Sequence, residues 1–184
     1  MLKYLLLIII FFLNHPVHSS IKDQIIAYLN ETNNLSFNFK QNINDKIENG
    51  YCVIKYPKKI FCEYDNNEQK IIISNGKSLL IKNKNSETFY LYPLNSTPLG
   101  IILDKNYLIK KINILEEKNI DNKYINFKMV ENDNVINIFF DYKTFKLIGW
   151  QTKDVYQNLI ITFISSIEIN QKINDKLFEF PKSK

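Results

Sequence analysis

The stretch GYCVIKYPKKIFCEY, residues 50–64, decides the fold of this chain. Polar and apolar residues alternate on both sides of a turn signal at Pro57, which is the pattern of a β-hairpin. An antiparallel strand normally keeps one face wet, yet residues 51–54 are apolar in succession. The hairpin therefore belongs to a sheet that is either covered on both faces or encloses an apolar hollow.

The two-residue period continues on both sides of this hairpin. It begins at Leu35, with Phe37, Phe39 and Gln41 on one side of the predicted strand. An Asn-Gly turn signal follows the third strand at Asn75. Further strand-like runs occupy residues 71–73, 78–82, 88–92, 124–131, 135–142, 147–153 and 159–169, and a turn is predicted at Asn132-Asp133-Asn134. The chain is thus predicted to be mainly β, with one curved antiparallel sheet.

Two segments have a helical pattern instead. Residues 20–34 repeat apolar side chains at helical spacing, from Ile21 to Leu29. Residues 98–104 form a short and very apolar segment, and Pro98 suits the first turn of a helix. Each apolar surface needs cover, so we expect both helices to pack on a face of the sheet.

The first residues have the pattern of a secretory signal peptide. Lys3 precedes an apolar run at residues 4–13, and small residues stand before the expected cut after Ser19. The run is shorter than the about 20 residues of a membrane-spanning helix, although an uncut membrane anchor is the alternative. We expect residues 1–19 to be removed and residues 20–184 to form a single domain.

Composition excludes several classes of function. The chain has no arginine, and both histidines, His15 and His18, leave with the predicted leader. Ser-His or Cys-His catalysis and His-based metal sites are then excluded, and we expect no cofactor, no metal and no enzymatic activity. The net charge is +5, but the lysines are scattered, which argues against nucleic-acid binding.

Several motifs, taken in order, resemble the outer-membrane lipoprotein carrier family, LolA. They cover about 140 residues of the chain, although none is specific alone. They are Ser36-Phe37-Asn38-Phe39-Lys40-Gln41, the hairpin from Gly50 to Tyr64, Ile73-Ser74-Asn75-Gly76-Lys77-Ser78-Leu79, Thr97-Pro98-Leu99-Gly100-Ile101-Ile102-Leu103 and Phe178-Glu179-Phe180-Pro181.

The resemblance implies a half-open barrel of about eleven strands, with short lid helices over a concave apolar face. It implies a monomeric periplasmic chaperone that takes lipoproteins from an inner-membrane ABC transporter to an outer-membrane acceptor by binding their acyl chains. Burial of about fifteen methylenes is worth about 12 kcal/mol, so such chains need an escort in water. The alternative is a periplasmic binder or sensor of another lipid or glycolipid.

Strand parity and the resemblance together give a candidate site. The predicted cavity residues are Phe37, Phe39, Cys52, Ile54, Tyr56, Ile60, Cys62 and Tyr64, and the predicted lid residues are Pro98, Leu99, Ile101, Ile102 and Leu103. Tyr56 stands where the family has an arginine thought to tether the lid. We expect its hydroxyl to donate one hydrogen bond to the lid backbone.

The two cysteines leave two possibilities open. Cys52 and Cys62 have the same parity and flank one turn, and a disulfide needs their Cα atoms within about 7 Å. Cross-strand bridges are geometrically demanding, and both positions look apolar in the family. Two free buried thiols are therefore favoured over a disulfide.

Overall fold

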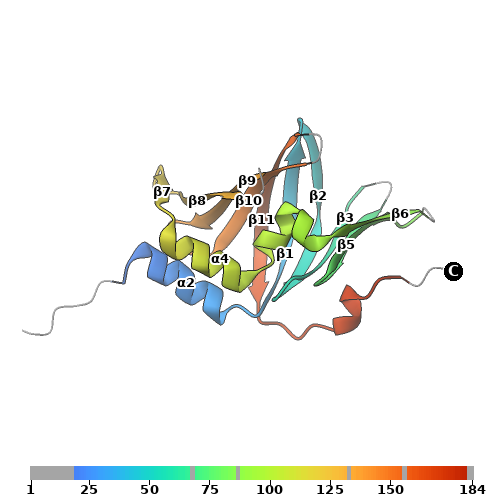
Figure 1. Cartoon of the computed structure of the whole chain (residues 1–184), viewed down its shortest axis with the longest axis horizontal. Coiled ribbons are helices and arrows are strands. Elements are labelled where there is room, and N and C mark those ends of the chain that lie inside the picture. Colours follow the sequence, from blue (N-terminus) through green and yellow to red (C-terminus); the bar gives the residue numbers. More distant parts are fainter. Residues whose placement is uncertain (1–18, 67–68, 86–87, 132–133, 155–156, 182–184) are drawn as a thin grey trace, which may run out of the picture.

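A single antiparallel sheet of eleven strands forms the body of the protein (Figure 1). The computed structural model describes residues 19–66, 69–85, 88–131, 134–154 and 157–181. The strands are β1 Asn34–Ile43, β2 Lys46–Lys55, β3 Lys59–Tyr64, β4 Lys70–Asn75, β5 Ser78–Asn83, β6 Phe89–Pro93, β7 Glu117–Ile120, β8 Tyr124–Glu131, β9 Asn134–Asp141, β10 Leu147–Lys153 and β11 Leu159–Ile169. The predicted mainly β class is confirmed.

The strand order explains why helices cover the sheet. It runs β6-β5-β4-β3-β2-β1-β11-β10-β9-β8-β7, so the sheet is not closed and β6 and β7 are its two edges. The chain between these edges must cross from one side of the sheet to the other. It does so as η1 Leu94–Ser96, α3 Pro98–Ile102 and α4 Lys105–Ile114. The resulting shape is the half-open barrel expected from the sequence.

The first helix, α2, spans Ile21–Glu31 and packs beside α4 over the same face (Figure 1). Ser20 caps it, because its hydroxyl accepts from the Asp23 N–H while the Asp23 carboxylate accepts from the Ser20 N–H. Its buried residues Ile25 and Leu29 face the sheet. The helix ends three residues before the predicted Asn34.

The lid helix also differs from its predicted bounds. It ends at Ile102 rather than Asp104, because Asp104 caps the next helix by accepting a hydrogen bond from the Tyr107 N–H. That next helix, α4, was not expected from the sequence. The predicted turn at Asn132-Asp133-Asn134 lies mostly outside the described residues, as do residues 1–18 of the predicted leader.

Two apolar layers lie on opposite faces of the sheet. The larger one fills the space between the sheet and helices α2, α3 and α4. The smaller one lies on the outer face of β2 to β5, where Val53, Ile73 and Leu80 are buried. The short helix η2, Asp175–Phe178, covers it through contacts with β3 and β4. This accounts for strands that are apolar on both faces.

Candidate functional site

The eight predicted cavity residues share the face of the sheet that the helices cover. The register pairs Cys52 with Cys62 and Ile54 with Ile60, and it places Phe37 beside Cys52 on the neighbouring strand. Seven of the eight are buried in one cluster, and Tyr56 packs against that cluster half-buried. The sequence therefore brings the right side chains to one surface, while their contact with a lipid stays a prediction.

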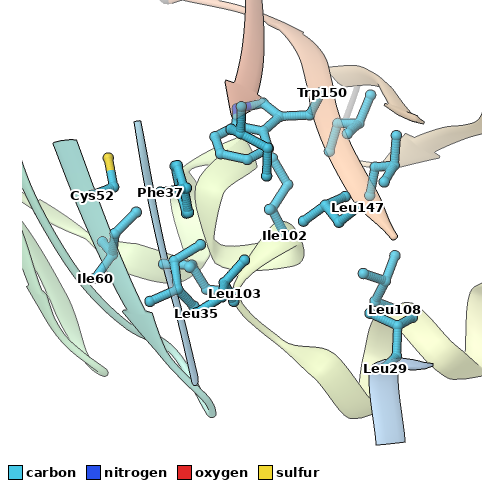
Figure 2. Close-up of a cluster of buried hydrophobic side chains, with 14 of the residues drawn as sticks. Leu29, Leu35, Phe37, Cys52, Ile60, Ile102, Leu103, Leu108, Leu147 and Trp150 are labelled. Carbon is cyan, nitrogen blue, oxygen red and sulfur yellow. The ribbon is translucent and has the colours of Figure 1, made fainter. Parts of the chain in front are cut away.

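The predicted lid residues close this surface. We call residues 98–103 the lid. Figure 2 shows Ile102 and Leu103 inserted between the β1 side chains Leu35 and Phe37 and the β10 side. Ile102 is 1% exposed and Leu103 is fully buried. A ligand could reach the sheet residues beneath the lid only if the lid moved.

The expectation of free thiols is wrong. Cys52 and Cys62 form a disulfide between β2 and β3, with their Cα atoms 4.1 Å apart. The register decides this, because the two cysteines are directly opposite one another and both side chains point inward. The bond lies in the floor beneath the lid, where both residues are at most 5% exposed.

The lid is attached to the β2–β3 turn by Lys58. Its N–H donates to the Leu103 carbonyl at 2.9 Å, and its Nζ lies 3.0 Å from Oδ2 of Asp104. Among the described residues, no hydrogen bond joins the Tyr56 hydroxyl to the lid, so that expectation is wrong. The contact with the lid therefore comes from Lys58 in the turn, two residues beyond Tyr56, from which it was expected.

Tyr56 instead contributes an apolar ring beside a cation from α4. Lys105 Nζ lies 5.7 Å from the centre of this ring and donates to the Thr32 carbonyl at 2.9 Å, at the end of α2. Burial, with a smaller contribution from Tyr28, raises the pKa of the Tyr56 hydroxyl, which stays neutral. Lys105 therefore links α4 to α2, and the C-terminal end of a helix such as α2 is a favourable place for a positive charge.

An apolar groove opens next to the lid. Its volume is 410 Å³, within the about 300–1,000 Å³ typical of pockets for small ligands. Leu79, Ile81, Tyr92, Pro98, Leu99, Thr152 and Ile160 form its walls, and the polar residues Ser96, Thr97, Asn134, Lys153, Asp154 and Gln157 complete its lining. Leu79 belongs to the buried cluster and Leu99 packs against it, so the groove borders the apolar interior.

A second hollow, of 430 Å³, lies near the lid and has a different chemistry. Lys58, Lys77, Asp104 and Glu131 contribute to its lining. These charges favour water over an alkyl chain. We therefore take the apolar groove as the candidate site, although the charged hollow is slightly larger.

Only Pro98 and Leu99 of the groove lining were predicted from the sequence. The other walls come from β5, β6, β10 and β11, which lie far apart along the chain. Strand parity assigns Ile160 to the inner face, but it does not show that β5 and β11 face one another across an opening. Lys58 had no distinguishing sequence signal at all.

A polar layer ends the apolar interior on the side away from α2. Gln41 Nε2 donates to the Thr162 hydroxyl at 2.9 Å, and the Tyr64 hydroxyl donates to Gln41 Oε1 at 3.3 Å. Beside them, Lys70 Nζ lies 2.6 Å from the carboxylate of Glu48. Burial opposes ionisation of Glu48, but Lys70 and Lys46 together hold its pKa below the usual range.

Glu48→Gln tests this charge pair. Because the pKa of Glu48 is lowered on folding, the stability it contributes is present above its unfolded pKa and is lost as pH falls through the folded value. We expect the variant to lose about 1–3 kcal/mol of unfolding free energy at pH 7, with a smaller difference below pH 4. Urea unfolding at several pH values measures this, and an unchanged difference at acid pH would contradict it.

The described residues contain no group of three or more His, Cys, Asp or Glu side chains that could hold a metal ion. Within the same ranges, none of the helices has the length and apolar character needed to cross a membrane.

The structure is an open half-barrel with an apolar interior, a helical cover and an apolar side groove. The chain belongs to the LolA family: the family profile described as "Outer membrane lipoprotein carrier protein LolA" matches residues 30–181. Proteins of this family are periplasmic, and the fold is that of a lipoprotein- and lipid-binding carrier family. No curated protein sequence matches the chain.

Solved structures with a similar fold are distant in sequence. A LolA superfamily protein from Nitrosomonas europaea is 8% identical, with a TM-score of 0.46 over 88% of this chain and 99% of that one. A putative outer membrane lipoprotein-sorting domain from Vibrio parahaemolyticus has 8% identity and a TM-score of 0.47, over 85% and 94%. MucB from the Pseudomonas aeruginosa MucA/MucB complex is also 8% identical, with a TM-score of 0.47 over 89% of this chain and 62% of that one.

Proposed function

We propose that this protein is a periplasmic carrier that binds the acyl chains of lipoproteins released from the inner membrane and delivers them to the outer membrane. One observation carries the proposal: the apolar groove borders an apolar interior that the lid covers. An acyl chain in the groove leaves water without a large change of fold. Movement of the lid would then admit more of it to the interior.

The proposal includes several further expectations. The protein is exported, cut after Ser19 and monomeric, and residues 20–184 form one domain. It receives cargo from an ABC transporter and passes it to an outer-membrane acceptor, without a cofactor and without catalysis. Mass spectrometry of the exported protein tests the cut, which predicts Ser20 as the first residue.

A matched pair of variants tests the site. Ile160 and Ile161 are neighbours in β11 and both are half-exposed, but Ile160 lines the groove and Ile161 has the opposite parity. Ile160→Lys puts an ammonium where the acyl chain would lie, and desolvating that charge is unfavourable. We expect it to weaken binding of a fluorescent triacylated lipopeptide at least about tenfold, as one buried charge easily offsets 1.4 kcal/mol.

Ile161→Lys is the control and should change this affinity by less than about twofold. An unacylated peptide of the same sequence should not bind either protein. Equal losses in the two variants would contradict the assignment of the groove. Binding of the lipopeptide without transfer between inner- and outer-membrane vesicles would favour the alternative, a binder or sensor of another lipid, whose identity mass spectrometry of co-purified material would show.

A further inference from the structure

The uncovered convex face of the sheet combines exposed apolar side chains with lysines. Helices α2, α3 and α4 lie on the concave side, and η2 covers the outer face of β3, β4 and the Val53–Lys55 end of β2 (Figure 1). The outer face of β1, of β2 from Ile47 to Tyr51, and of β8 to β11 has no such cover among the described elements. Its exposed apolar residues, assigned by strand parity, are Ile47, Tyr51, Tyr124, Val130, Leu159 and Phe163. We call these residues the convex patch.

The sheet register arranges this face in rows. One row crosses from β1 to β7 as Lys40, Phe163, Gly149, Phe139, Asn126 and Lys118. Its two phenyl rings stack across Gly149 with their centroids 6.5 Å apart, and Phe163 is 48% exposed. Aromatic rings thus occupy the middle of the row, and a lysine stands at each end.

Three exposed lysines of this face have no carboxylate partner among the described residues. Eight lysines of the described chain, such as Lys22 and Lys70, form ion pairs with carboxylates, while others away from this face, such as Lys110, form none. Lys40, Lys118 and Lys128 are exposed and form none within the described ranges. The acidic groups on or beside this face are Asp141, Glu168 and Glu63. The Asp141 carboxylate accepts from the N–H groups of the following turn, Glu168 lies near the far end of β11, and Glu63, opposite Tyr51 on β3, is paired with Lys84.

We propose that the convex patch docks on an anionic lipid bilayer. Unpaired lysines complement lipid phosphates, and tyrosine and phenylalanine suit the interface between headgroups and acyl chains. The groove and the patch meet at the end of the β10–β11 hairpin, where Lys153 lines the groove and pairs with Leu159 of the patch. A protein docked by this face holds the groove opening close to the membrane. The proposal goes beyond acyl-chain carriage and rests on different residues.

Co-sedimentation with vesicles tests it, using phosphatidylglycerol mixed with phosphatidylcholine against phosphatidylcholine alone. The full mature chain should bind only the anionic vesicles, and less as salt rises. Lys40→Gln/Lys118→Gln/Lys128→Gln should weaken this binding about tenfold or more, since each lysine near the surface contributes. The matched control Lys110→Gln/Lys172→Gln/Lys176→Gln removes the same charge from exposed sites elsewhere, and it should keep most of the vesicle binding.

Phe163→Thr tests the apolar contribution, with Tyr90→Thr on the edge strand β6 as its control. We expect weaker vesicle binding only for the first. Three results would each overturn the proposal. They are equal losses of vesicle binding in the two lysine variants, binding to neutral vesicles alone, and a concentration-dependent dimer that Phe163→Thr abolishes. Ile160→Lys distinguishes membrane docking from acyl-chain carriage, because that variant should no longer bind the lipopeptide but should still bind anionic vesicles.

Discussion

Replacing both cysteines, as Cys52→Val/Cys62→Val, is expected to lower the free energy of unfolding by about 2–3 kcal/mol. The disulfide closes a loop with a sequence separation of 10, and a cross-link of that span restricts the unfolded chain by about this amount. Valine keeps both sites apolar and of similar volume, so a cavity adds little to the loss. The melting temperature should fall by about 5–10 °C for a domain of this size.

Thermal unfolding with and without reductant measures this. The wild-type protein should lose a similar amount of stability when reduced, whereas the double variant should not respond to reductant. Below its melting temperature the variant should still bind the acylated probe, because the floor stays apolar. A wild-type melting temperature that is insensitive to full reduction, confirmed by thiol titration, would contradict the prediction.

Gly100→Ala is expected to displace the lid. A Cβ at this position would lie 2.4 Å from the Leu94 carbonyl oxygen, well inside any tolerated contact, and the atom it meets is backbone. Alanine is the better helix former by about 1 kcal/mol, but a backbone clash of this size outweighs that gain. Because η1 is held by a hydrogen bond from the Leu94 N–H to the Lys77 carbonyl, we expect α3 to move instead.

Hydrogen exchange measures this displacement. The Gly100 and Leu103 amides donate to the carbonyls of Thr97 and Leu99, and their exchange should become about 5- to 150-fold faster for a cost of about 1–3 kcal/mol. Buried residues of α4 such as Leu108 should keep their protection. Uptake of the acylated probe should also be faster, because the lid no longer has to be displaced.

Asn106→Ala, an exposed change on α4, is the control and should leave lid exchange unaltered. If Gly100→Ala leaves it unaltered as well, η1 has yielded in place of α3. In that case the lid is fixed to the interior more firmly than to the β6 edge, and its opening has to begin elsewhere.

Local pattern was enough for the main features of the fold. Two-residue alternation around Cys52 and Cys62 predicted the β2–β3 hairpin and the common inward face of its side chains, because side chains alternate strictly across a strand. The helical spacing of Ile25 and Leu29 predicted α2 for a similar reason. Pro98 marked the beginning of the lid helix.

Other features were hidden because their signals are weak locally. Helix α4 was missed because its two buried residues, Leu108 and Ile112, lie among Tyr107, Ile109 and Ile114, which obscure the helical period. The disulfide could not be chosen from parity alone. Same-face cysteines on adjacent strands bond only if the register sets them opposite one another, and register depends on the turn.

What the sequence determined by itself, then, was the set of strands, the inward side chains and a short apolar cover. Only the tertiary structure decided that β1 lies beside β11, which sends the connection between the edge strands β6 and β7 across the concave face as a lid. That path brings Leu103 to Lys58 and places Leu79 and Ile160 on walls of one groove. The physical reason is that these contacts join residues far apart in sequence, so they depend on strand order, which local hydrophobic periods do not encode.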